Sequence, residues 1–188
     1  MLLRALLVLM ALLPQDGYLP LKDGARWTYV VEDLGAEATA PAREVVAEVG
    51  GAAPNADPDW MAVANYLGYR SCWLRASSDG IELKIDPRAD APALTILKTS
   101  AKVGETWTGS LGRDELRFTQ RGEETIELGD TRTQALRIEF TASPEKHAGH
   151  AATHGDVWFA AGKGVVRAQL TTDLDCHSAL TKVYTLKP

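Results

Sequence analysis

Alternation of apolar and polar side chains constrains the fold of this chain more than any other feature. In the segment "RWTYVVED", the large apolar residues Trp27, Tyr29 and Val31 occupy every second position. This period of two is typical of a strand with one buried face, and no segment shows the sustained 3.6-residue period of a long helix. The chain is therefore predicted to be all-β and mainly antiparallel, with few short helices, one of which could begin at Asp57-Pro58.

Two later segments show the same alternation, and their apolar side chains are predicted to share one buried face in each strand. These residues are Leu136, Ile138 and Phe140 in "QALRIEF", and Val166, Ala168 and Leu170 in "VVRAQLTTDL". In the second segment Val165 is expected on the opposite face.

Turn residues separate the alternating runs. The Asp79-Gly80 pair in "SSDGI" suits a tight hairpin between two strands. "QRGEET" is predicted to be a turn between "LRFT" and "TIEL", and "AGKGVVR" is predicted to be a hairpin or a bulge. Counting the runs gives about ten or eleven strands.

The first residues resemble a secretory signal peptide rather than part of the folded domain. Residues 1–14 contain Arg4, then nine uncharged apolar residues, then Pro14. Nine helical residues reach about 14 Å, less than half of the roughly 30 Å hydrocarbon core, so no permanent membrane span is expected. Export to the periplasm, the cell envelope or the extracellular space is predicted, with a retained anchor as the alternative. Residues 15–188 are predicted to form a single β-rich domain.

The two cysteines, the net charge and the absence of known motifs limit the covalent links, partners and cofactors that can be expected. After export, Cys72 and Cys176 would meet an oxidising environment, where two cysteines are expected to form one disulfide; two buried free thiols are the alternative. A formal charge of −5 offers no attraction to phosphate backbones, so nucleic acid is not an expected partner. No dinucleotide, phosphate-binding or nucleophile-elbow motif occurs, so no cofactor and no catalytic residue are predicted.

A short motif, Gly-x-x-Trp, accompanies three of the five tryptophans. The pairs are Gly24 with Trp27, Gly104 with Trp107, and Gly155 with Trp158, and the first two lie in "KDGARWT" and "KVGETWT". Glycine can supply a turn conformation that other residues rarely adopt, after which the indole falls on a fixed face of the new strand. The three indole rings are predicted to close the core, or alternatively to line a cavity for an apolar or carbohydrate ligand.

Four phrases occur in an order that resembles the TapB-like (DUF3108-like) families of bacterial exported proteins. They are "YLPLKDGARWTYVV", "ILKTSAKVGETWTG", "ETIELGDTRTQALRIEF" and "DVWFAAGKGVVRAQL". The resemblance covers residues 18 to about 188. It implies a strongly curved antiparallel sheet or half-barrel and an envelope location, and it implies no reaction. This chain lacks the lipid-attachment cysteine that many such proteins carry.

The segment "SPEKHAGHAATHGD" contains three of the four histidines. If it were helical, His147, His150 and His154 would share one face at positions i, i+3 and i+7 and could bind zinc or copper, with Asp156 or Glu145 as a further ligand. The alternative is a solvated surface loop, since Gly149 weakens a helix of this length.

Three functions are compatible with these features. The first is an exported, non-enzymatic β-protein that binds a lipid-like apolar ligand or an envelope protein through its curved sheet. The second is a structural or interaction module whose interior is filled by its own side chains. The third is a metal-binding protein that uses the histidine segment.

Overall fold

The alternating runs form strands of one antiparallel sheet in the computed structural model, which describes residues 17–35, 40–52, 59–88, 90–112, 114–143, 153–173 and 179–188. These ranges contain twelve strands and no helix, so none that is long and apolar enough to cross a membrane. The strands are β1 (Arg26–Leu34), β2 (Arg43–Ala52), β3 (Met61–Tyr66), β4 (Tyr69–Ser77), β5 (Gly80–Lys84), β6 (Leu94–Lys98), β7 (Thr106–Leu111), β8 (Asp114–Leu128), β9 (Thr131–Ala142), β10 (His154–Ala160), β11 (Gly164–Asp173) and β12 (Ala179–Leu186).

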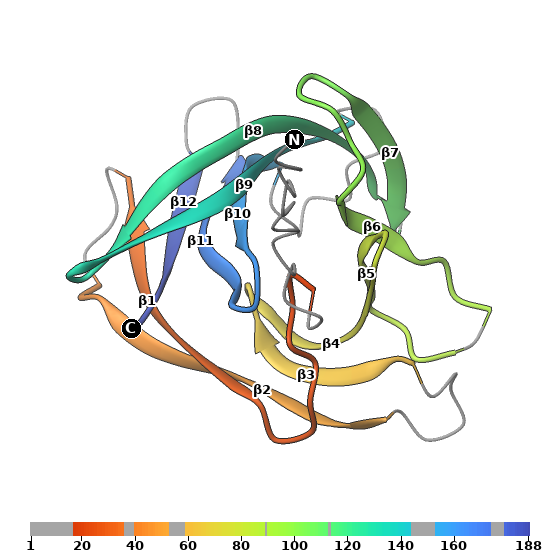
Figure 1. Ribbon diagram of the computed structural model, residues 1–188, viewed down its shortest axis with the longest axis horizontal. Helices are drawn as coiled ribbons and strands as arrows, with labels where there is room; N and C mark the ends of the chain where they lie inside the picture. Colours follow the sequence, from red (N-terminus) through yellow and green to blue (C-terminus); the bar gives the residue numbers. More distant parts are fainter. Residues whose placement is uncertain are drawn as a thin grey trace, which may run out of the picture.

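The sheet curves into a nearly closed barrel (Figure 1). Its strand order is β6-β5-β4-β3-β2-β1-β12-β11-β10-β9-β8-β7, so strands that follow one another in the chain pair with each other, except β6 and β7, and β1 also pairs with β12. The edge strands β6 and β7 come together at the right of Figure 1 without a backbone ladder between them. The predicted all-β, half-barrel class is confirmed, with twelve strands rather than ten or eleven.

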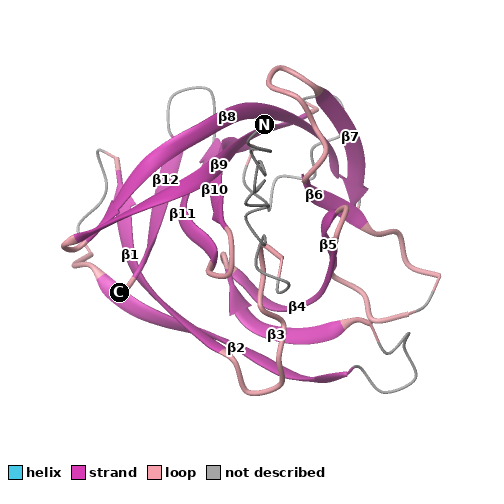
Figure 2. Cartoon of the chain, in the orientation of Figure 1, coloured by secondary structure: helices cyan, strands magenta, loops and turns pink. Residues whose placement is uncertain are grey.

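The predicted turn at "QRGEET" is wrong. Strand β8 continues through this segment for 15 residues, as the long strand in Figure 2 shows, and pairs with β9 along its length. The register shifts between Gln120 and Gly122, where Gly122 has a φ of +103°. Glycine here forms a β-bulge that bends the strand without ending it, which helps a long strand follow a curved sheet.

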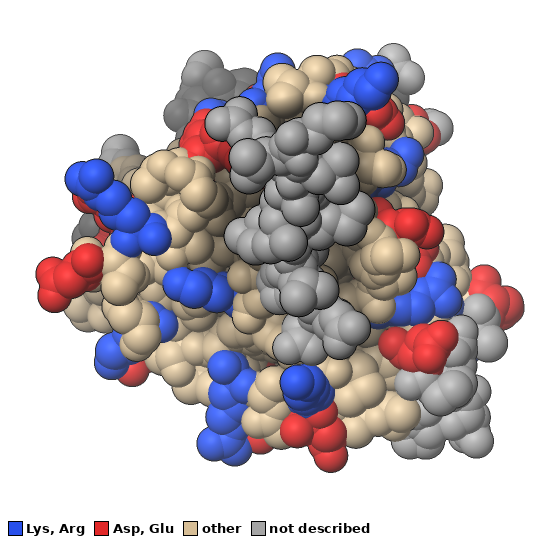
Figure 3. Space-filling model, viewed as in Figure 1, with Lys and Arg blue, Asp and Glu red and all other residues tan. Residues whose placement is uncertain are grey.

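The inner face of the barrel is the main core. Trp27, Tyr29 and Val31 all face inward as predicted, and so do Ile138 and Phe140. Basic and acidic side chains intermix on the outer surface seen in Figure 3, so that no patch of a single sign gathers there.

The predicted faces of β11 are correct for Ala168 but wrong for Val165 and Val166. Val165 belongs to the inner core, whereas Val166 packs in a small second cluster with Trp158. The cause is a register shift between β10 and β11 beside Trp158, where one extra residue reverses the alternation.

The first two Gly-x-x-Trp motifs have the same backbone geometry, as predicted. The glycine φ angles are +76° at Gly24 and +84° at Gly104. In both motifs the amide of the residue after the glycine donates to the carbonyl of the lysine at 2.9 Å, which closes a four-residue turn with glycine in third place. The glycine amide then donates to the neighbouring strand, at Val49 in the first motif and at Gln120 in the second.

Gly155 is different, because it lies within β10 and has no positive φ. A Cβ at this position would overlap the carbonyl oxygen of Gln169 and come within 3.0 Å of the Phe140 ring. The third motif therefore needs glycine for close approach of the neighbouring backbone, and the prediction of a turn there is wrong.

The two uses of glycine predict different costs for alanine. Gly24→Ala should lower the free energy of unfolding by about 1 to 2 kcal/mol, because alanine is strained at positive φ. Gly155→Ala should cost more, about 3 kcal/mol, because the neighbouring backbone must move. Urea denaturation measures both, with Gly51→Ala as a control, since a Cβ there meets nothing within 4 Å. Equal losses at Gly155 and Gly51 would contradict the close-approach explanation.

Candidate functional site: an apolar cavity inside the barrel

The inward-facing side chains leave a cavity of about 340 Å³ inside the barrel. This volume lies at the small end of the ~300–1,000 Å³ typical of ligand pockets. Strands β5 to β12 and the turn between β3 and β4 supply its lining residues. The cavity therefore exists because the sheet curves almost fully around, which brings strands far apart in sequence to face one another.

Most of the cavity wall is apolar. Leucine and isoleucine side chains come from β5 to β9 and from β11 and β12, and three phenylalanines come from β8, β9 and β10. Those aromatic residues are Phe118, Phe140 and Phe159. Trp107 pairs with Phe118 across β7 and β8 and stacks on its ring with centroids 5.7 Å apart, which helps to hold this ring in place. Such a surface favours an apolar chain over water.

Polar side chains also line the cavity, and they come from few places. The six are Tyr66, Tyr69, Asp114, Thr172, Lys182 and Tyr184. Tyr66 ends β3, Tyr69 begins β4, Asp114 begins β8, Thr172 lies near the end of β11, and Lys182 and Tyr184 lie on β12. In an up-and-down barrel the β3–β4, β7–β8 and β11–β12 connections share one end, so the cavity is polar toward that end.

Burial raises the pKa of the cavity tyrosines, whose phenols are uncharged at neutral pH even at their ordinary pKa. It raises the pKa of Tyr66 well above its ordinary value and that of Tyr69 to about 12. Burial also raises the pKa of Tyr184. These phenols therefore present hydrogen-bond donors, not charges, to whatever occupies the cavity.

None of these polar cavity residues was predicted from the sequence, although one signal was available. In "ALTKVYTL" of β12, alternate positions are Leu180, Lys182, Tyr184 and Leu186, so a lysine occupies the otherwise apolar face. A charged residue among alternating apolar ones is unusual enough to mark a candidate site.

None of the three predicted tryptophans lines this cavity. Trp27 is buried in the core, where its ring makes an edge contact with Tyr66 at 6.4 Å. It also borders a more open cleft of about 370 Å³ at the opposite end, beside Arg26, Lys163 and Lys187. Each of these three basic side chains already has a polar partner.

Trp107 joins the two edge strands of the barrel. Its indole Nε1 donates to the carbonyl oxygen of Thr95 on β6 at 2.8 Å. The Leu94 side chain on β6 also packs closely against Gly109 on β7. A Cβ at Gly109 would lie only 2.6 Å from this side chain, so only glycine leaves room for the contact. A side chain thus connects β6 to β7 where the sheet has no backbone ladder.

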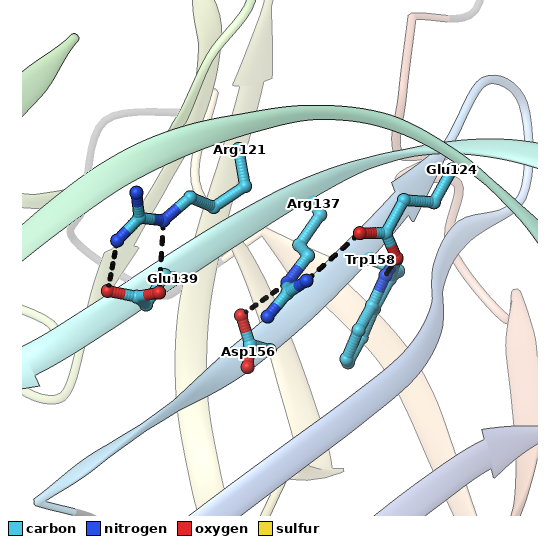
Figure 4. Close-up of polar contacts among 6 residues, drawn as sticks. All are labelled: Arg121, Glu124, Arg137, Glu139, Asp156 and Trp158. Atoms are coloured by element: carbon cyan, nitrogen blue, oxygen red, sulfur yellow. Dashed lines mark hydrogen bonds and ion pairs between the residues drawn. The ribbon is translucent and has the colours of Figure 1, made fainter. Parts of the chain in front are cut away.

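Trp158 faces outward and belongs to a polar cluster shown in Figure 4. Its Nε1 donates to Glu124 at 2.8 Å, and Arg137 bridges Glu124 at 3.0 Å and Asp156 at 2.7 Å. The guanidinium groups of Arg137 and Arg167 lie 5.5 and 5.4 Å from the centroid of the indole. With these partners the indole is held in place on the outer face.

The predicted metal site falls largely outside the described residues, which exclude His147, His150 and Glu145. His154 is the first residue of β10 and is exposed, with its Nδ1 3.7 Å from Asp173. Within the described ranges no group of three potential metal ligands comes together. Zinc or copper binding by this segment stays a prediction.

The predicted disulfide stays untested in the same way, because Cys176 lies outside the described residues. Cys72 is fully buried in β4, and burial raises the pKa of its thiol to about 12. A thiol of this kind is a poor nucleophile at neutral pH.

Comparisons with known proteins place the chain near two solved structures. One is a presumed exported protein with a YmcC-like fold from Bacteroides fragilis, at 14% identity, with 88% of this chain and 95% of that chain covered and a TM-score of 0.48. The other is the hypothetical lipoprotein YmcC from Escherichia coli, at 11% identity, with 87% of each chain covered and a TM-score of 0.39. At these values the likeness assigns no function. No family model and no curated protein matches the sequence, so the TapB-like resemblance stays an expectation.

Removing the indole donor at the β6–β7 junction should loosen that junction. Trp107→Phe keeps an aromatic ring against Phe118 but leaves the Thr95 carbonyl without its partner, which should cost about 1 kcal/mol. Hydrogen exchange followed by mass spectrometry should show faster exchange in β6 and β7 than in β1 and β12.

The matched control is Trp73→Phe, because the buried Trp73 Nε1 has no acceptor among the described residues. Its removal should leave exchange at the junction unchanged. Equal effects of the two variants would show that the Trp107 hydrogen bond does not hold the edge strands together.

The outer cluster predicts an acid-dependent loss of stability. Hydrogen bonds from Trp158 and Arg137 hold the pKa of Glu124 below its ordinary value, so they stabilise the fold above pH ~4.3 and are lost as the pH falls through the lowered pKa. Glu124→Gln should destabilise the protein at pH 7 but much less at pH 3, as measured by urea denaturation. Glu127→Gln, at an exposed ion pair on the same strand, is the control.

Proposed function

We propose that this protein binds a single-chain apolar or amphiphilic molecule inside its barrel. The observation that carries the proposal is the apolar cavity of about 340 Å³ in an otherwise buried interior. Protein interiors are normally packed to the density of organic crystals, so a space of this size is unusual in a core built only for stability.

The size and the chemistry of the wall support one chain rather than a bulky ligand. Every strand from β5 to β10 contributes at least one apolar side chain to the lining, and the volume is small for a ligand pocket. A flexible alkyl chain would bury its surface against leucine, isoleucine and phenylalanine side chains. The free energy of binding would come from the hydrophobic effect, which requires no specific functional group along the alkyl chain.

The alternative of a filled-core structural module fits less well. It predicts no cavity larger than a water molecule, whereas this cavity is about ten times the ~30 Å³ that water occupies in the liquid. Binding of an envelope protein is a weaker candidate, because the described residues show no large apolar patch on the outer surface; the exposed large hydrophobic residues are scattered singly.

The cell envelope is the proposed location. This proposal is based on residues 1–14, which resemble a signal peptide and precede the described residues. A barrel that encloses an alkyl chain would shield it from the aqueous space outside the cytoplasmic membrane. Carriage or sequestration of such a molecule, rather than a reaction on it, is the proposed role.

Filling the cavity should abolish binding. Val157 and Leu170 line the cavity from β10 and β11 and are only partly buried, so Val157→Trp or Leu170→Trp would place an indole in the space. The wild type should bind the neutral probe N-phenyl-naphthylamine saturably, and either variant should weaken this binding at least about tenfold. Native mass spectrometry after detergent-free purification should also show bound mass only in the wild type.

Val46→Trp provides the control, because Val46 lies on the outer face of β2 and is 42% exposed. This variant should bind the probe as the wild type does. Circular dichroism and the thermal midpoint show whether each variant is folded. A wild type with neither bound mass nor a saturable signal would contradict the proposed function.

A further inference from the structure

Among the described residues, one lysine lines the cavity inside the barrel. Lys182 lies on β12, on the same face as the core residue Tyr184, and it lines the cavity while only partly exposed. Burying a lysine is costly unless a partner compensates its charge. Among the described residues, no carboxylate lies within ion-pair distance of its ammonium group.

The neighbouring polar groups on this wall are also without partners. Thr172 is a diagonal neighbour of Lys182 across β11 and β12, because Lys182 pairs with Leu170 and Thr172 pairs with Leu180. Diagonal neighbours lie about 7–8 Å apart, within reach of a lysine side chain. Within the described ranges, the hydroxyls of Thr172 and Tyr184 make no hydrogen bond.

Tyr66 adds a further donor at the same cavity. Its side chain is completely buried, and its hydroxyl has no hydrogen-bond partner among the described residues. A buried donor left unsatisfied costs about 1–3 kcal/mol, so such groups are rare in folded proteins. An occupant with acceptor atoms would supply what these hydroxyls lack.

One acidic residue on this wall lies opposite Lys182 without pairing with it. Asp33 is in register with Lys182 across β1 and β12; one of its carboxylate oxygens accepts from Arg43 at 3.2 Å, and the other, Oδ1, is buried with no hydrogen-bond partner among the described residues. Asp114 lines the cavity and has a partner of its own. Lys182 and Arg43 therefore share a single neighbouring carboxylate, Asp33, where β12, β1 and β2 lie side by side.

From this arrangement we infer that the ligand carries an anionic head group, which Lys182 binds with the hydroxyls of Thr172 and Tyr184. The inference rests on the proposed function and names the class of ligand for the same cavity: a single-chain amphiphile such as a long-chain carboxylate or alkyl phosphate. Its head accepts hydrogen bonds from an ammonium group and hydroxyls, which are strong when one partner is charged. Its chain lies against the apolar wall formed by residues such as Leu94, Leu116 and Phe140.

The test compares ligands that share one chain and differ in the head. Isothermal calorimetry with dodecanoate, dodecyl phosphate, dodecanol and dodecylamine measures affinity for the full-length folded protein. At least one of the two anions should bind at least about tenfold more tightly than the alcohol, and the amine should bind most weakly. The anion that binds more tightly identifies the head group, and acetate and inorganic phosphate show whether a head binds without a chain.

Variants of Lys182 then assign the preference to this residue. Lys182→Met keeps the length of the side chain and removes the charge, so it should weaken binding of the preferred anion at least about tenfold and weaken dodecanol binding much less, because the hydrogen bond to an uncharged hydroxyl is weaker. Lys182→Arg should retain most of the preference. Lys102→Met, at an exposed turn far from the cavity lining, is the matched control.

The outcomes separate the two proposals. If the anions and the alcohol bind equally to the wild type, the head-group inference is wrong while the cavity still binds a chain. If Lys182→Met binds the preferred anion as tightly as the wild type, the role of Lys182 is wrong. If no dodecyl compound binds, both the inference and the proposed function fail.

Discussion

Pairing between the first and the last strand is the constraint on which the barrel depends. β1 and β12 form a continuous antiparallel ladder from Tyr29 opposite Leu186 to Leu34 opposite Thr181. All other ladders join strands that are adjacent in the chain. Without this long-range ladder the strands would form two separate meanders, β1 to β6 and β7 to β12, and the inner faces that form the core and the cavity would not meet. Closing so long a loop costs chain entropy, which the shared core must offset.

The two junctions of the barrel are built differently. The β1–β12 junction is a backbone ladder, whereas β6 and β7 are joined through the Trp107 indole and the contact of Leu94 with Gly109. The two Lys-x-Gly-x-x-Trp-Thr motifs lead into β1 and β7, which lie half a barrel apart in the strand order. The same turn thus precedes a strand at the β1–β12 junction, which has a backbone ladder, and a strand at the β6–β7 junction, which has none.

One part of the core is packed with side chains, and another part surrounds the cavity. Trp27, Tyr29 and Val31 on β1 are buried, and β1 and β2 contribute nothing to the lining of the cavity. The opposite strands leave space, and the polar end of the cavity contains donors without partners among the described residues, including Lys182 and the Tyr66 hydroxyl. A core that leaves such groups unsatisfied sacrifices stability at that place, which is the usual sign of a binding site.

The sequence by itself determined the strand class, the inward face of β1 and the turns at Gly24 and Gly104, because these follow from side-chain alternation and from local backbone conformation. Only the tertiary structure decided the bulges at Gly122 and beside Trp158, because a bulge depends on the partner strand. The same holds for Trp158, which the alternation of β10 alone could not place inside or outside. The cavity and the surroundings of Lys182 depend on closure of the sheet, which places β5 to β12 around one space. Local sequence patterns do not show which distant strands will face one another.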